Sequence, residues 1–320
     1  MAYKINPLPL EDFTKAAKLW RQELLMLPVL AMGDVTKFLT LLPGCTTNQF
    51  LGSANIDAQF APYEANKRNE GGADLVYREL EIYFGSMNVD FIPNDYIQTL
   101  LGKGAASKGD AMKGAPLAKL IIANVMKNAG HNMASAIFNA KRNPSGTKSA
   151  DLFNGFATIA EKEIQDGNLS ADKGNFVQLT EDITKANCVD VIKNIVFELD
   201  PQLRRQECFL YCDPAILDKY NEAYKLTGAS LVYNTQYEQA YVEGSNHRLT
   251  FAPVDSLAGS KLMFIAPKEN MVYGFDSMSD LEQLEVLRLD VDTLTLAAKT
   301  FVGTQFRTLD KRMLKVIKQK

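Results

Sequence analysis

The sequence has 320 residues, of which 46% are hydrophobic and 23% are charged, with 20 glycines and 12 prolines. These values are ordinary for a folded protein and exclude a disordered, collagen-like or disulfide-scaffold chain. Lys and Arg number 35 against 38 Asp and Glu, so the chain lacks the basic surplus of a dedicated DNA-binding protein. Because one hydrophobic core rarely grows beyond about 250–300 residues, we expect two or three lobes.

The cellular compartment is suggested by the cysteines and by the apolar runs. The four cysteines are scattered, and the sequence does not open with the basic and apolar regions of a secretion signal. The longest apolar run, 24–32, contains Pro28 and is far shorter than the roughly 20 residues that a membrane span needs. We therefore expect a reduced, cytoplasmic protein without a membrane span.

The first predicted element is an amphipathic helix over 10–27 that ends at Pro28. Its apolar side chains recur every three or four residues, at Leu10, Phe13, Ala17, Trp20, Leu24 and Leu27. This stripe must be covered either by the chain's own core or by a neighbouring molecule.

From 45 to 93 the pattern changes to alternating apolar and polar residues. Two extended runs flank a polar, glycine-bearing stretch at 66–72, which predicts a long two-stranded arm. The alternation changes phase at Gly85 and Ser86, where we expect a β-bulge. Because a two-stranded hairpin is at best marginally stable alone, another surface is expected to cover the arm.

A small-residue loop at 102–114 precedes the longest helical pattern. Pro116 fits the first helical position, and apolar spacing predicts a helix over 116–142 that would be about 40 Å long. Gly130 is a candidate bend within it.

A mixed lobe follows this helix. It is predicted to contain a helix over 181–199, the strand CFLYC, and a helix that Asp213 caps and Gly228 ends. Short strands are expected at 248–254, 261–266 and 271–275, and alternation predicts further strands after 286.

Catalytic chemistry finds little support in the sequence. The only two histidines, His131 and His247, show no metal-binding or triad spacing. Cys208 and Cys212 share a strand face about 13 Å apart, too far to bridge or to bind one metal, and are interpreted as structural thiols. The stretch GKGAAS is interpreted as a loop, and outward-facing strand positions account for the paired acidic residues. No catalytic, cofactor-binding or metal residue is therefore predicted.

Two groups of residues are candidates for binding. The basic end of the chain places Lys311, Arg312 and Lys315 where they are candidates for non-specific contact with nucleic-acid phosphate. The tip of the predicted arm carries Asn66, Lys67 and Arg68, which are candidates for contact with a neighbouring subunit.

The order of the elements resembles the major capsid proteins of tailed bacteriophages, with the Hong-Kong-97-type fold that encapsulin shells also use. YRELEIYFGSMNVDFIPNDYIQTLL is similar to the strand that leaves the extended E-loop and enters the peripheral P-domain. APLAKLIIANVMKNAGHNMASAIFNAK is similar to the spine helix, and DLFNGFATIAEKEI to the segment after it. NCVDVIKNIVFELDPQLRRQECFLYCDPAILDKY and LTFAPVDSLAGSKLMFIAPKENMVYGFD are similar to the axial A-domain.

This resemblance implies an α+β fold with five parts. The expected parts are an N-terminal arm at 1–44, an E-loop at 45–92, a P-domain with the spine helix at 93–160, an A-domain at 161–285, and C-terminal P-domain strands with a basic tail at 286–320. The N-terminal arm and the E-loop are each expected to reach a neighbouring subunit.

The resemblance also implies a structural protein of the virion, not an enzyme. It would form hexamers and pentamers that close, in the bacterial cytoplasm, into an icosahedral head around double-stranded DNA. No cofactor is expected. A portal protein and scaffolding or decoration proteins are expected partners, and the scaffolding protein is expected to be either a separate chain or absent. The alternatives are an encapsulin-type nanocompartment, an enzyme built on the mixed lobe, or a tail or adaptor protein that forms rings or tubes.

Overall fold

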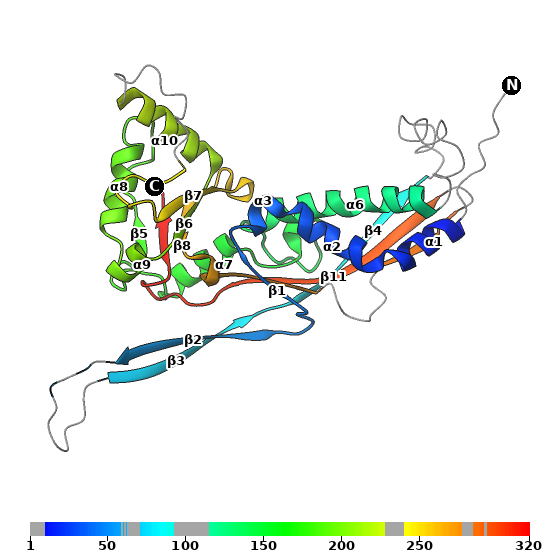
Figure 1. Ribbon diagram of the computed structural model, residues 1–320, viewed down its shortest axis with the longest axis horizontal. Helices are drawn as coiled ribbons and strands as arrows, with labels where there is room; N and C mark the ends of the chain where they lie inside the picture. The colour runs from blue at the N-terminus through cyan, green and yellow to red at the C-terminus, as the bar shows by residue number, and fades with distance from the viewer. Residues whose placement is uncertain are drawn as a thin grey trace.

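The computed structural model describes residues 10–58, 60, 62, 71–92, 115–227, 240–276, 284–290 and 293–320. They form an elongated molecule with three parts, a central domain, a lobe at one end and a hairpin that projects from the body (Figure 1). None of the helices in the described ranges is long and apolar enough to cross a membrane.

The central domain is built on a five-stranded sheet assembled from distant parts of the chain. Its longest strand pairs antiparallel with three others, and the fifth strand pairs parallel with one of these. The long strand is β11 (Leu294–Phe306), its antiparallel partners are β4 (Tyr83–Phe91), β9 (Met271–Asp276) and β10 (Leu284–Arg288), and β1 (Thr40–Pro43) pairs with β9.

Helices cover one face of this sheet (Figure 1). They are α1 (Leu10–Leu19), α2 (Arg21–Ala31), the short α3 (Gly33–Thr36) and the long α6 (Ala115–Ala136). Phe13, Leu24, Ile122 and Leu296 are buried together between helices and sheet. The apolar stripe of the first helices is therefore largely covered by the chain's own core. Contact of the N-terminal arm with a neighbouring subunit stays a prediction.

Pro28 does not end the N-terminal helical segment, contrary to prediction. The break lies at Trp20, and α2 continues through Pro28 to Ala31. The Pro28 carbonyl still accepts the Met32 N–H at 3.2 Å, so the proline removes one donor without ending the helix.

Gly130 has a role other than the predicted bend. A Cβ atom at this position would overlap the Pro28 carbonyl oxygen and lie 2.7 Å from the Pro28 Cα. The missing side chain is what lets α2 cross α6 so closely.

The long helix predicted over 116–142 is shorter in the structure, where α6 ends at Ala136. Ile137 and Phe138 are then fully buried in a turn, and the Phe138 carbonyl accepts the N–H of Ala157 at 2.9 Å. The last predicted turn of helix is therefore replaced by chain that packs into the core.

The hairpin consists of β2 (Gln49–Ala58) and β3 (Gly71–Leu80), paired antiparallel over their whole length. The predicted two-stranded arm is confirmed, but the bulge is wrong, because β4 pairs with β11 without interruption through Gly85 and Ser86. The buried face changes instead at residues 81–82, where the chain leaves the hairpin and joins the central sheet.

The lobe contains a second five-stranded sheet with the order β5-β12-β8-β6-β7. The strands are β5 (Phe176–Gln178), β6 (Cys208–Cys212), β7 (Leu249–Pro253), β8 (Leu262–Ala266) and β12 (Lys315–Lys318). The other α-helices in the described ranges are α7 (Phe156–Gln165), α8 (Cys188–Phe197), α9 (Pro201–Arg205) and α10 (Pro214–Thr227). Among the described residues, 3₁₀ turns lie at η2 (Ser149–Asp151), η3 (Asp255–Leu257) and η4 (Lys268–Asn270).

Most elements predicted for the lobe are confirmed. The strands predicted at 208–212, 248–254, 261–266 and 271–275 are present as β6, β7, β8 and β9 (Met271–Asp276). The Asp213 carboxylate accepts the Ala215 N–H at the start of α10. The helix expected from 181 begins only at Cys188, because the Asn187 side chain bonds the Thr184 N–H and so holds a turn before it. Gly228, the predicted helix stop, lies outside the described residues.

Strand pairing crosses two of the predicted part boundaries. β9, expected in the A-domain, belongs to the central sheet, and β12, expected in a basic tail, belongs to the lobe sheet. Sequence alternation identifies a strand but not the sheet that it joins, which explains both differences.

Candidate subunit-contact surface

One face of the hairpin carries large apolar side chains into solvent. Register pairs Gly52 with Tyr77 and Ala54 with Leu75, and directly paired residues share a face. Phe50 lies on the same face, two residues before Gly52. Phe50 is 73% exposed, and Leu75 and Tyr77 are each 63% exposed. We call Phe50, Leu75 and Tyr77 the outer face of the hairpin.

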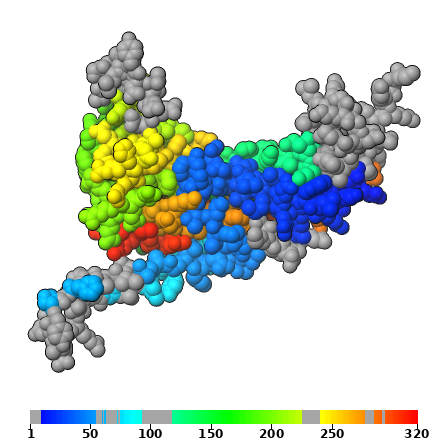
Figure 2. All heavy atoms as spheres, in the orientation of Figure 1, coloured from blue at the N-terminus to red at the C-terminus, as the bar shows by residue number. Residues whose placement is uncertain are grey.

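The outer face is unusual because its apolar residues are neighbours on a projecting element. Figure 2 shows the hairpin extending away from the rest of the molecule. Beyond the end of β2, Phe60 is also fully exposed. Contiguous exposed apolar surface is a mark of sites that bind a protein, a membrane or a ligand.

The inner face of the hairpin base packs against the body. Leu51 and Leu80 are buried with Val272 of the central sheet. Asn48 joins both sides of the base, because its Nδ2 donates to the Glu79 carboxylate at 2.7 Å and its Oδ1 accepts the Ile82 N–H at 2.9 Å. The hairpin thus has a fixed base and an exposed outer face.

The predicted arm-tip residues Asn66, Lys67 and Arg68 lie outside the described residues. Their contact with a neighbouring subunit stays a prediction. The outer face itself was not predicted, although the sequence contained a signal for it. Leu75, Val76 and Tyr77 are three consecutive apolar residues on one strand. Because side chains alternate along a strand, such a run places apolar residues on both faces.

The three candidate phosphate-binding residues have different surroundings. Lys315 is buried in β12, its ammonium donates to the Gly174 carbonyl at 3.0 Å, and burial lowers its pKa. Arg312 pairs with Asp310 at 2.7 Å. Lys311 is the exposed member, with its ammonium 3.6 Å from the Asp200 carboxylate. The basic end is therefore folded into the lobe, and phosphate contact stays a prediction that the geometry favours for Lys311.

The thiols and histidines are not arranged for catalysis in the part of the chain that the structure describes. All four cysteines are buried as free thiols, and burial raises the pKa of Cys188 to about 11 and of Cys208 to about 12. His131 is exposed on α6, and His247 packs edge-on against Tyr241 in a loop of the lobe. Among the described residues, no group of three potential ligands could hold a metal ion.

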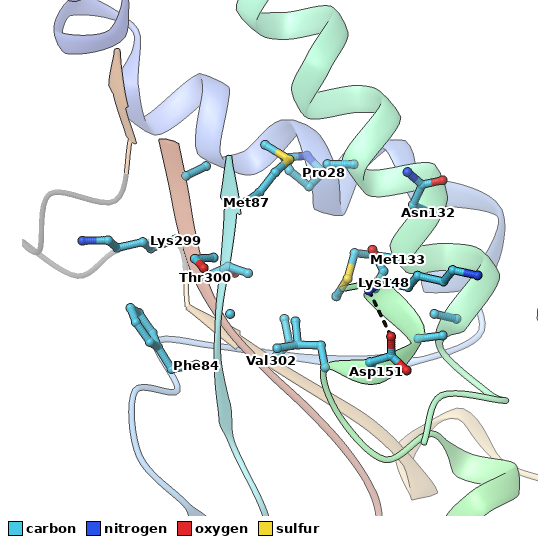
Figure 3. Close-up of a pocket in the computed structure, with 18 of the residues that line it drawn as sticks. Pro28, Phe84, Met87, Asn132, Met133, Lys148, Asp151, Lys299, Thr300 and Val302 are labelled. Atoms are coloured by element: carbon cyan, nitrogen blue, oxygen red, sulfur yellow. Dashed lines mark hydrogen bonds between the residues drawn. The ribbon is translucent and has the colours of Figure 1, made fainter. Parts of the chain in front are cut away.

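A cavity of about 850 Å³ lies between α6 and the central sheet. Figure 3 shows Met133 and Val302 lining it from these two layers, with Lys148 and Asp151 at one side. The Asp151 carboxylate accepts the Lys148 backbone N–H at 3.0 Å and so caps a turn. Neither His nor Cys is found among the described residues that line it.

Comparison with known proteins assigns the fold. No protein-family model matches the sequence, and no curated protein matches it. A procapsid of satellite phage P4 that includes the size determination protein Sid is similar in structure, with a TM-score of 0.59 over 92% of this chain and 90% of the other, at 10% identity. The capsids of native and empty GTA particles match with TM-scores of 0.52 and 0.53, over 90% of both chains, at 12% and 10% identity.

The chain has the Hong-Kong-97-type capsid fold. The predicted α+β class is confirmed. The assignment of α6 as the spine helix, of β2 and β3 as the E-loop and of the lobe as the A-domain stays a prediction. At 10–12% identity the likeness concerns the fold, and function rests on further argument.

Proposed function

We propose that this protein is a structural shell subunit, the major capsid protein of a tailed bacteriophage, and not an enzyme. Many copies associate as hexamers and pentamers and close into an icosahedral head around double-stranded DNA. The outer face of the hairpin carries this proposal, because a monomer leaves Phe50, Leu75 and Tyr77 in water.

Two observations support the proposal together. The capsid fold extends over about nine tenths of the chain, and the element that projects from it carries apolar side chains that its own body does not bury. A second copy of the same chain offers the partner surface that an isolated hairpin lacks. Obligate interfaces of this kind bury about 2,000–5,000 Å².

The enclosed DNA and further partners belong to the proposal. A net charge of −3 suits a wall that holds DNA through few, salt-sensitive phosphate contacts. Portal, scaffolding and decoration proteins would complete the head, and assembly would take place in the bacterial cytoplasm.

The test is expression of the full chain, alone and with the products of neighbouring genes, followed by size-exclusion chromatography and negative-stain microscopy. Closed particles with icosahedral outlines are expected. Rings or tubes would support the tail or adaptor alternative, and a stable monomer at all concentrations and with all partners would refute the proposal.

Particle contents separate the two kinds of shell. Nuclease-protected double-stranded DNA in particles isolated from infected cells is expected for a phage head. Particles that enclose an enzyme and no DNA would instead indicate a nanocompartment.

A further inference from the structure

Two glycines form a notch in the central sheet directly under the base of the hairpin. Gly274 of β9 and Gly303 of β11 are paired in register. A Cβ atom at Gly303 would collide with the Glu81 carbonyl oxygen, and one at Gly274 would lie 2.8 Å from Leu80 Cδ2. The absence of a side chain at Gly303 lets the Glu81 backbone lie this close to the sheet, and Gly274 leaves room for the Leu80 side chain.

Beside the notch, Arg78 of β3 ties the hairpin to two elements of the body. Its Nη2 donates to the Glu163 carboxylate of α7 at 2.6 Å and to Gln305 Oε1 at 3.1 Å, and its Nε donates to the Phe306 carbonyl at 3.1 Å. The Arg78 and Glu163 side chains are only 15% and 13% exposed. Removing one partner of a charge pair so shielded from water is costly, because it leaves a partly buried charge unpaired.

The network continues on both sides of Arg78. Gln305 Nε2 donates to the Glu79 carbonyl at 2.8 Å, and Asn168 Nδ2 donates to the second oxygen of Glu163 at 2.7 Å. The hairpin strand is therefore held by its backbone and by its arginine, and the carboxylate that receives the arginine is itself held in place.

These contacts have a mechanical consequence. The hairpin joins the body through two short chain segments, 44–48 and 81–82, and two such segments by themselves permit the hairpin to pivot. A directional, multidentate arginine contact beside a steric notch removes that freedom.

We propose that the Gly274–Gly303 notch and the Arg78–Glu163–Gln305 network form a socket that fixes the direction of the hairpin within a single subunit, before any partner binds. Arg78 is then a positioning residue for the outer face. Because the arm is ordered in advance, the binding of a neighbour does not have to offset the conformational-entropy cost of ordering it. That last consequence rests on the proposed function, whereas the socket itself does not.

The test measures distances in the unassembled subunit, isolated by size-exclusion chromatography. Spin labels are placed on cysteines introduced at two exposed positions, Leu75 on the hairpin and Lys173 on the lobe, while the four native thiols are buried. Pulsed electron–electron double resonance on the otherwise unchanged chain is expected to give one narrow distribution of distances between the two labels. Arg78→Gln and Gly303→Ala are each expected to shift the main distance or to abolish the narrow peak.

Two further variants keep the test decisive. Lys185→Gln removes an exposed ion pair with Glu222 on the lobe and is expected to leave the distribution unchanged. If Gly303→Ala does not fold, Glu163→Gln replaces it as a same-sized change. The socket is overturned if Arg78→Gln and Glu163→Gln both give the same mean distance and the same distribution width as the unchanged chain. Failure to form particles refutes the proposed function but leaves this distance measurement valid.

Discussion

At the scale of single residues, the close approach of two elements requires a glycine at two positions, and burial leaves one lysine with a backbone carbonyl as its partner. Gly130 allows the α2–α6 crossing, Gly303 accommodates the hairpin base, and Lys315 is buried with its ammonium bonded to a backbone carbonyl. None of these roles follows from the residue type alone, since each depends on an element distant in sequence.

Gly130→Ala is expected to destabilise the protein. In an ordinary helix interior the same change stabilises by about 0.5–1 kcal/mol, but here the new Cβ would overlap the Pro28 carbonyl. We expect a loss of about 1–3 kcal/mol in the free energy of unfolding, as for overpacked cores. Urea unfolding measures it, with Gly33→Ala as the control because no atom lies within 4 Å of its Cβ position. Equal or greater stability of Gly130→Ala would contradict the crossing.

The Glu163 carboxyl makes hairpin attachment sensitive to acid. Burial raises its pKa, but hydrogen bonds from Arg78 and Asn168 outweigh burial, so the pKa lies below its ordinary value of 4.5. A carboxyl with a depressed folded pKa contributes stability that is fully present above its unfolded pKa and is lost as pH falls through the folded pKa. The stability difference between the unchanged protein and Glu163→Gln should therefore shrink as pH falls below about 4.5.

Chemical unfolding at a series of pH values measures this difference. The control is the same pair of proteins in an Arg78→Gln background, where the pH dependence should be much smaller because the main hydrogen-bond donor is gone. A difference that stays constant from pH 6 to the acid limit of folding would contradict the assignment.

At the scale of elements, the hairpin is a projecting part of the fold whose outer face its own chain leaves uncovered. Its inner face has a socket, whereas its outer face has only solvent. The helices α1 and α2 show the opposite case, since their apolar stripe is buried on α6 and the sheet.

Charges on the outer face are expected to stop assembly without unfolding the subunit. Leu75→Asp and Tyr77→Asp each place a carboxylate where a partner is proposed to bury an apolar side chain, so particles should be lost. Because both positions are exposed, the free energy of unfolding should change by no more than about 0.5 kcal/mol. Size-exclusion chromatography and negative-stain microscopy give the result.

Val76→Asp is the matched control. Val76 lies between these residues on the opposite face and is 47% exposed. Particle formation by Val76→Asp together with its loss in the other two variants is expected, and normal particles from Tyr77→Asp would count against the outer face as an interface.

At the scale of the whole molecule, the central domain and the lobe are interleaved. After the lobe strand β8 the chain enters the central sheet as β9, and after the central strand β11 it enters the lobe sheet as β12. We expect the two to unfold together, with the hairpin as a separable attachment.

Replacing residues 53–76 by Asn-Gly tests this separability. The Gly52–Tyr77 pair would then flank a two-residue turn of the kind that closes hairpins, and Leu51, Arg78 and Leu80 would keep their contacts. Calorimetry is expected to show one unfolding transition at an unchanged midpoint, while particles are lost. A lower midpoint would show that the outer hairpin stabilises the body.

The alternating strands, the long helix, the hairpin and their order along the chain could be predicted from the amino-acid sequence. Periodicity reveals these features because it reports which face of an element avoids water. Three features could be seen only in the folded chain: α1 and α2 pack on α6, β9 and β12 lie in the sheets opposite to those expected, and Lys315 is buried. The physical reason is that periodicity identifies an apolar face but not the surface that covers it, which packing between distant segments selects.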